Sequence, residues 1–465
     1  MSKQRIANLV SDLFDDWQRA TNKAKMLDLW MRGENRNPLM PLGKRSVEME
    51  EIYEISSTPW ARLLIGSVAQ GLSLLDHREG GSDTSTATFV DVWKPNGLIS
   101  RQGAVYRSAL AHNLSYVTTL PGRRPHTGLP TVKMRGVSAK RMVAFYDDEE
   151  GDDFPTWALW GEVQNPGQKG EFLALRLYDD ERSYYLAARP NGTEMEYISE
   201  ERHDVGVTPV HRFAPHLDLD GRATGEVEPF IPMLRRLDQD SFDRLVVQRF
   251  NSWRIRFATG LETPQTDAER RAAAAWLEIS DILVSSNKDA RFGTLDPTDI
   301  KQYIDARDSD IRELSAVSQT PPHYLLGQMA NLSAEALASA EASLVRKIED
   351  YKLSFEQSWD QALRSCAFIL ARSYPDGGYE AEAVNYETQF RWADSESRSL
   401  AQAVDALGKI ATQLEVPVEM LWEQIPFWEK DDTERAKNLL ADRELNTLLG
   451  QFLDQDQGQE LDATG

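Results

Sequence analysis

Three histidines are the first side chains of this sequence that could bind a metal ion. His203, His211 and His216 are separated by eight and five residues, and this spacing fits no common zinc pattern. The cysteines that usually complete such sites are missing, because the chain has one cysteine. We therefore interpret the three histidines as polar residues of loops and strands.

Two acidic segments could bind a divalent cation. The sequence Asp218-Leu-Asp220-Gly221 begins like a calcium-binding loop but lacks a glutamate where such a loop ends, so it predicts a turn. The run from Asp147 to Asp153 holds six acidic residues around one glycine. We interpret this run as a solvated loop between strands. A nuclease that uses it with Mg²⁺ is the enzymatic alternative.

The motifs of common enzymes do not occur in the sequence. It has no Gly-x-x-x-x-Gly-Lys-Ser/Thr phosphate loop, no His-Glu-x-x-His pair, no Gly-x-Ser-x-Gly turn and no Cys-x-x-Cys. Cys366 lies on the apolar side of a predicted helix, which indicates a small buried side chain rather than a catalytic thiol. The sequence thus predicts a protein without catalytic activity, cofactor or metal.

The chain of 465 residues is acidic, with a formal net charge of −22 at pH 7. Proteins that grip DNA neutralise phosphates with Lys and Arg, so tight DNA binding is not expected. An acidic wall would instead repel phosphates and let a duplex move past, although excess charge also simply aids solubility. No stretch approaches the ~18 apolar residues that span a bilayer, and no secretory signal begins the chain. We expect synthesis in the cytosol.

The longest predicted helix runs from residue 334 to 372. Pro321 and Pro322 end the helix before it, and Ser333 is a good N-cap. At ~1.5 Å per residue the helix is about 57 Å long. Its apolar residues recur at steps of three, four or seven and form one stripe: Leu337, Leu344, Ile348, Tyr351, Phe355, Trp359, Ala362, Cys366 and Ile369.

The rest of the chain predicts helices around a region of short strands. Runs of β-branched and aromatic residues separated by Gly, Pro, Asn or Asp predict an antiparallel meander over residues 114–213. A mixed insert, residues 252–299, lies between two helices and contains a helix at 267–277 and a strand at 281–285. Residues 1–75 are expected to be helical, with Leu9, Leu13, Trp17, Ala20 and Ala24 near helical spacing and a second helix at 60–75. The remaining predicted elements are helices at 100–113, 228–251, 300–318 and 395–414, a turn at 374–379, a strand at 386–392 and a helical start to the segment 431–465.

An ordered series of segments resembles a known family. Asp305–Leu326, Asn331–Leu337 and Ile348–Lys352 are similar to the stem, tunnel loop and tunnel helix of portal proteins from tailed double-stranded DNA bacteriophages of the siphophage type. Ala290–Tyr303 and Phe390–Ser399 resemble the same family. The resemblance covers approximately residues 225 to 428.

The resemblance implies an α+β fold that is mainly α-helical, with an antiparallel β region in the wing and a small mixed clip. The implied division is a wing at 1–224, a first stem helix at 225–252, a clip at 253–299, a second stem helix at 300–318, a tunnel loop region at 319–333, a long tunnel and wing helix at 334–372, a return to the wing at 373–394, and a crown with an acidic tail at 395–465.

The resemblance also implies function and partners. A portal subunit forms a dodecameric ring at one capsid vertex of the virion, through which double-stranded DNA is packaged and ejected without sequence-specific binding. Its partners are other copies of itself, the major capsid protein and scaffold, the large terminase and then the head-tail adaptor, and no membrane. A non-enzymatic oligomeric helical adaptor is the alternative of a different class.

Three sets of residues follow from this resemblance. Gln328, Met329 and Asn331 match the tunnel loop that approaches DNA, and they include no lysine or arginine. Arg254, Arg256, Arg270 and Arg271 lie in the clip that faces terminase and adaptor. The charged residues of the stem are Arg235, Arg236, Asp240, Arg244, Asp305, Asp308 and Arg312. The resemblance implies that they join neighbouring subunits. Their spacing alone favours ion pairs from i to i+4 on a solvent-exposed helix face.

Overall fold

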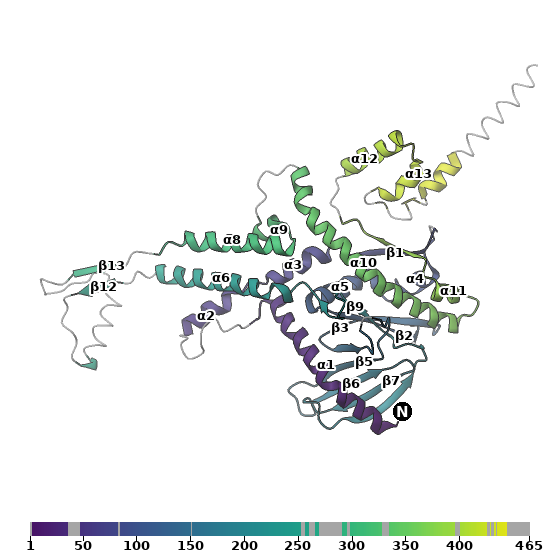
Figure 1. Ribbon diagram of the computed structural model, residues 1–465, viewed down its shortest axis with the longest axis horizontal. Helices are drawn as coiled ribbons and strands as arrows, with labels where there is room; N and C mark the ends of the chain where they lie inside the picture. Colours follow the sequence, from purple (N-terminus) through teal and green to yellow (C-terminus); the bar gives the residue numbers. More distant parts are fainter. Residues whose placement is uncertain are drawn as a thin grey trace, which may run out of the picture. The chain divides into compact units, whose positions relative to one another are not determined.

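The protein has an α+β fold that divides into two compact units, Met1–Ser395 and Glu396–Gly465. Figure 1 shows the chain in a computed structural model. The structure describes residues 2–35, 47–81, 84–149, 151–252, 256–259, 266–268, 291–294, 298–327, 334–395, 400–425, 428, 432–433 and 435–443.

Helices make up about half of the described residues of the first unit. Its longest helix is the predicted one, which ends one residue later than expected. The helices are α1 (Lys3–Arg32), α2 (Val47–Ser56), α3 (Trp60–Ala69), α4 (Ala87–Val92), α5 (Leu98–His112), α6 (Ile231–Ser252), α8 (Lys301–Ser318), α9 (Pro322–Leu326), α10 (Ala334–Ser373) and α11 (Tyr379–Val384).

Five strands form the predicted antiparallel meander. They pair in sequence order: β4 (Met142–Phe145), β5 (Trp157–Gln164), β6 (Phe172–Tyr178), β7 (Arg182–Ala188) and β8 (Glu196–Arg202). The prediction of one meander is wrong for the rest of the region. There β2 (Ser115–Arg123) lies between β3 (Pro130–Ser138) and β9 (Val210–Phe213) in a second antiparallel sheet, because β9 returns to pair with a strand that is distant in sequence.

One other strand pairing corrects a predicted element. The helix predicted over 60–75 ends at Ala69, and β1 (Leu74–Glu79) follows it and pairs with β14 (Thr388–Trp392). The turn predicted at 374–379 is followed directly by α11. The short strands β10 (His216–Leu217) and β11 (Ala223–Thr224) flank the predicted turn, where Asp218 Oδ1 accepts hydrogen bonds from the backbone amides of Asp220 and Arg222.

Helix α1 covers one face of the five-stranded sheet (Figure 1). Ile6, Val10, Phe14 and Trp17 recur on one side of the helix and pack on the leucines of β5 and β6. Trp17 Nε1 also donates a hydrogen bond to the Arg141 carbonyl over 3.0 Å. The helix starts at Ser2, whose hydroxyl accepts from the Arg5 amide.

Helix α10 forms the centre of the main core with α3 and α5. The predicted apolar stripe is confirmed from Leu344 to Ile369, while the side chain of Leu337 lies outside the described residues. Trp359 is fully buried, and its Nε1 donates to the Tyr106 hydroxyl over 2.9 Å. Cys366 is also fully buried, and burial raises the pKa of its thiol.

Helices α6 and α8 run side by side as a hairpin (Figure 1). A 3₁₀ turn, Glu228–Phe230, precedes α6, so the α-helix itself starts three residues later than predicted. Between the helices, β12 (Arg256–Thr259) pairs with β13 (Arg291–Thr294). The predicted strand 281–285 and most of the predicted helix 267–277 lie outside the described residues.

The second unit contains α12 (Leu400–Gln413), α13 (Val418–Leu421) and a 3₁₀ turn, Trp422–Gln424. Residues 435–443 are also helical. The helix predicted over 395–414 thus corresponds to α12. The acidic tail from residue 444 lies outside the described residues.

Candidate functional site: the helical hairpin and its buried base

Ion pairs join the two helices of the hairpin. Arg236 on α6 lies 2.7 Å from Asp310 and 2.5 Å from Glu313, both on α8. The expectation of i to i+4 pairing along α6 is wrong for this arginine, because α8 supplies its carboxylates. Asp238 is also not a surface partner. It is buried and accepts a hydrogen bond from the Thr58 amide over 3.2 Å.

Asp240 lies beside Asp310 in the same helix interface. Partial burial, followed by the hydrogen bond and the negative charge of Asp310, raises the pKa of Asp240 to about 6. Two carboxyl groups in contact are most stable when they share one proton, since two charged groups would repel each other. The contact therefore places a carboxyl group with a raised pKa between the two helices.

Arg244 and Arg307 form a basic part of the same interface. The Arg307 guanidinium lies over the Trp60 ring at 5.6 Å, and burial together with the charge of Arg244 lowers its pKa. The Nε atoms of both arginines are buried, and neither has an acceptor among the residues that the structure describes. Donors of this kind are most stable when an acceptor is supplied.

A buried ion pair lies at the base of the hairpin. Lys347 Nζ on α10 is 2.5 Å from Glu226 Oε2, just before α6, and donates to the Ser318 carbonyl at the end of α8 over 2.8 Å. The Tyr351 hydroxyl donates to the other oxygen of Glu226. Burial and, as a smaller cause, the negative charge of Glu226 raise the pKa of Tyr351. One lysine therefore ties α10 to both ends of the hairpin.

The position of Lys347 in the sequence indicates a buried ion pair, although helical periodicity alone does not identify its partner. Lys347 falls between Leu344 and Tyr351 on the stripe of α10 that faces the core. A lysine inside an apolar stripe requires a buried partner, because an unpaired charge is costly away from water. The stripe thus predicts that a carboxylate lies nearby, but not which one.

The predicted break at the two prolines is confirmed. Helix α8 ends at Ser318, and Gln319 is left-handed with φ of 56°. Pro321 is extended, and Pro322 starts the short helix α9, which the sequence did not indicate. The predicted tunnel residues Gln328, Met329 and Asn331 lie outside the described residues.

The predicted clip arginines are described only in part. Arg256 lies in β12 opposite Thr294, and its side chain is outside the described part of the structure. Arg254, Arg270 and Arg271 lie outside it altogether. Their role toward a partner stays a prediction.

The remaining stem charges lie on both helices. Asp305 and Arg312 are exposed on α8, and Asp308 is half-exposed. Arg235 lines a cavity of about 730 Å³ beside α2, together with Asp238. The structure does not gather these residues with Arg236 into one cluster, and their role between subunits stays a prediction.

The potential metal ligands are dispersed. His211 is buried in β9 with Nε2 2.8 Å from the Thr119 hydroxyl, and His216 Nδ1 lies 3.8 Å from an Asp350 oxygen. The acidic run lies in an exposed loop between β4 and β5, where Glu149 pairs with Arg212 at 2.6 Å. Within the described ranges, no group of three or more His, Cys, Asp or Glu could hold a metal ion. No described helix is long and apolar enough to cross a membrane.

The chain is therefore a helix-rich α+β protein with an ion-paired helical hairpin anchored on a buried helix. The model of the family "Phage portal protein, SPP1 Gp6-like" matches residues 56–446, and the chain belongs to this family. The resemblance recognised from sequence is thereby confirmed. Portal proteins are structural components of the phage virion at the capsid vertex used for DNA packaging. The family match favours the portal interpretation over the adaptor and nuclease alternatives.

Two known proteins are similar to most of the chain. The portal protein of Mycobacterium phage D29 is 24% identical over 375 residues, which cover 78% of this chain and 74% of the relative. The portal protein of Mycobacterium phage L5 is 23% identical over 383 residues, with the same coverage of both chains. A chain from a solved structure, "Neck of empty GTA particle computed with C6 symmetry", matches 83% of this chain and 95% of its own length with 10% identity and a TM-score of 0.45.

Proposed function

We propose that twelve copies of this chain close into a ring at one capsid vertex, and that double-stranded DNA passes through the central channel during packaging and ejection. The match of the portal family to residues 56–446 is the observation that carries this proposal. A ring requires head-to-tail contacts, in which each copy uses two different surfaces.

The hairpin of α6 and α8 supports its assignment as the stem. An ion pair of Arg236 joins its two helices within the chain. Asp305 and Arg312 are exposed on α8, where a neighbouring copy could pair with them. The buried donors of Arg244 and Arg307 could also receive acceptors from that copy. The segments on either side would then form the wing (1–224, 373–394), the clip (253–299) and the crown (395–465).

The net negative charge of the chain supports a channel in which DNA can slide rather than a site that binds DNA tightly. A net charge of −22 repels phosphates and provides no deep binding minimum. The tunnel residues Gln328, Met329 and Asn331 would approach the duplex without a cationic side chain that could grip it.

The clip would bind the protein partners in turn. We assign Arg254, Arg256, Arg270 and Arg271 to a surface that faces the large terminase during packaging and the head-tail adaptor afterwards. The wing and crown would contact the major capsid protein and scaffold. The chain would be made in the cytoplasm of the host bacterium before it enters the virion.

Native mass spectrometry and negative-stain class averages of the purified protein test the proposal. We expect closed rings with a central hole and twelve-fold or nearly twelve-fold symmetry. The charge reversal Arg312→Glu should lower the fraction of rings, whereas Arg189→Glu, on an exposed hairpin of the β region, should not. A protein that stays monomeric under all assembly conditions would overturn the proposal.

A further inference from the structure

The two sheets of the β region contribute side chains to one shared apolar cluster and to one cavity. Near Tyr116 of β2 and Tyr178 of β6 the facing side chains form a closed apolar cluster. Beside this cluster, and with Tyr178 in its lining, lies a cavity of about 470 Å³. This volume falls in the range of about 300–1,000 Å³ that is typical of small-ligand sites.

The floor of this cavity is a row of three side chains across neighbouring strands. Trp160 of β5 lies opposite Arg176 of β6, which lies opposite Tyr185 of β7. The Arg176 guanidinium is 5.7 Å from the Trp160 ring and 4.6 Å from the Tyr185 ring, and its Nη1 donates to the Tyr178 hydroxyl over 3.2 Å. The aromatic rings thus hold the cation in place without neutralising it.

The opposite wall adds two more cations. Lys133 and Arg135 of β3 pair in register with Leu120 and Thr118 of β2. All four residues line the cavity, so the two cations lie on the face of this sheet that is turned toward the five-stranded sheet. Neither of them, nor Arg176, forms an ion pair with a carboxylate in the described part of the chain. Like charges that face one another across a gap repel, even though the protein as a whole is strongly acidic.

The other charges of the lining do not cancel these three. Arg141 pairs with Glu162 at 2.9 Å, and Arg202 pairs with Asp204. Glu201 is the carboxylate among the lining residues, and it accepts a hydrogen bond from the Tyr185 hydroxyl over 3.0 Å. Three cations against one carboxylate leave an excess of two positive charges at the cavity.

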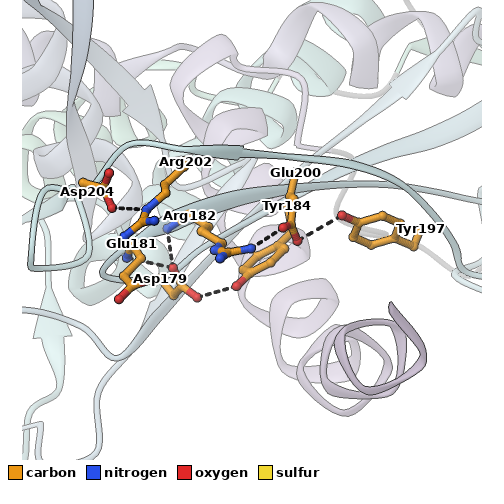
Figure 2. A network of polar contacts seen from close by, with 8 residues as sticks. All are labelled: Asp179, Glu181, Arg182, Tyr184, Tyr197, Glu200, Arg202 and Asp204. Carbon is orange, nitrogen blue, oxygen red and sulfur yellow. Dashed lines mark hydrogen bonds and ion pairs between the residues drawn. The ribbon is translucent and has the colours of Figure 1, made fainter. Parts of the chain in front are cut away.

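A polar network fixes the strands that carry these groups. Figure 2 shows the Asp179 carboxylate accepting from the Glu181 and Arg182 amides and from the Tyr184 hydroxyl, at 2.9, 2.5 and 2.8 Å. In the same network Arg182 and Tyr197 both bind Glu200. The hairpin of β6 and β7 and the edge strand β8 are therefore held before any ligand arrives, which lowers the entropic cost of binding.

We propose that this cavity, lined by Lys133, Arg135 and Arg176, is a binding site for a small phosphate-bearing ligand. A phosphate dianion matches the excess of two positive charges, and guanidinium groups bind its oxygens through paired N–H donors. Glu201 would oppose the anion and favour binding on the side of Lys133 and Arg135. The residues that line the site lie outside the hairpin of α6 and α8.

Isothermal titration of the full chain in a low-salt chloride buffer tests the proposal. The probes are inorganic phosphate, adenosine 5′-monophosphate and a short DNA duplex. We expect saturable binding of phosphate or the nucleotide with one site per chain, and tighter binding of the nucleotide if the natural ligand is a phosphorylated small molecule. Arg135→Gln, at an exposed position where folding is not at risk, should weaken this binding on the order of tenfold.

The matched control is Arg189→Gln, which removes the same charge from an exposed arginine paired with Glu194 outside the cavity. This variant should bind like the unaltered protein. Equal weakening by both substitutions, no saturable binding of phosphate or nucleotide at millimolar concentration, or binding of the duplex alone would each overturn the proposal.

Discussion

Lys347 on α10 and Glu226 before α6 form an ion pair of 2.5 Å, and each side chain is less than a tenth exposed. The ammonium group also donates to the Ser318 carbonyl at the end of α8. Because the same pair contacts both ends of the hairpin and the central helix, it fixes where the hairpin leaves the body of the first unit.

The pair should be far more sensitive to loss of one partner than to loss of both. Lys347→Met leaves Glu226 buried without its counter-ion, and we expect the free energy of unfolding to fall by about 3–5 kcal/mol. Lys347→Met combined with Glu226→Gln should lose less than the sum of the single changes. Urea denaturation of the three variants measures this coupling.

Lys409→Met is the control for that experiment. Lys409 pairs with Asp405 on α12, but both side chains are more than half exposed. Such a pair contributes only about 0.3–0.5 kcal/mol. A loss for Lys347→Met as small as that for Lys409→Met would show that the buried pair does not stabilise the fold.

His211 should make the protein less stable in acid. Burial, with the charge of Arg364 as a smaller cause, lowers the pKa of His211 to about 3. Between that pH and the ordinary histidine pKa of about 6.5, His211 is therefore neutral in the folded chain but protonated in the unfolded chain. Stability is therefore lost as the pH falls from about 6.5 toward 3. His211→Gln should reduce the slope of unfolding free energy against pH by about 1.4 kcal/mol per pH unit between pH 6 and 4.

His126→Asn provides the comparison, because His126 is exposed in a loop with φ of 71°, a conformation that Asn tolerates. This variant should keep the slope of the unaltered protein in urea denaturation at each pH. An unchanged slope in His211→Gln would contradict the assignment of His211 as a buried neutral histidine.

Asp240 should act in the opposite direction. Its pKa is raised to about 6, so the folded chain holds a proton that the unfolded chain releases above its ordinary value of 3.8. The stabilisation that this proton provides is lost as the pH rises through about 6. Asp240→Asn should stabilise the hairpin at pH 7 and have little effect at pH 4.5. Thermal unfolding at both pH values measures the difference, and Asp305→Asn on the exposed face of α8 should not show it.

Two glycines predict opposite effects of the same substitution. A Cβ atom at Gly161 would lie 2.5 Å from the Trp17 ring, which is itself held by its hydrogen bond to Arg141. Gly161→Ala should therefore destabilise the protein by about 1–3 kcal/mol. Gly66 lies within α3 with no atom within 4 Å of such a Cβ, so Gly66→Ala should stabilise by about 0.5–1 kcal/mol. A denaturation midpoint that does not fall in Gly161→Ala would contradict the packing of α1 on the sheet.

Local patterns were enough to predict the elements whose signal lies within a short stretch. The apolar stripe of α10, the break at Pro321 and Pro322, and the strands β4 to β7 follow from periodicity and from turn residues. The family resemblance predicted that residues 225–252 and 300–318 form two stem helices, but it did not predict which of their charged residues form ion pairs. Arg236 reaches across to α8, while spacing favoured partners on its own helix.

Sequence by itself determined that this chain has a long helix with one buried face, a region of antiparallel strands and a resemblance to the phage portal family. Only the tertiary structure decided that β9 returns to β2, that β14 pairs with β1, that Lys347 meets Glu226, and that Arg135 and Arg176 line one cavity. The physical reason is distance along the chain. Helical periodicity and turns are set by neighbouring residues, whereas these contacts depend on which buried surfaces fit together, and no short stretch of sequence encodes that choice.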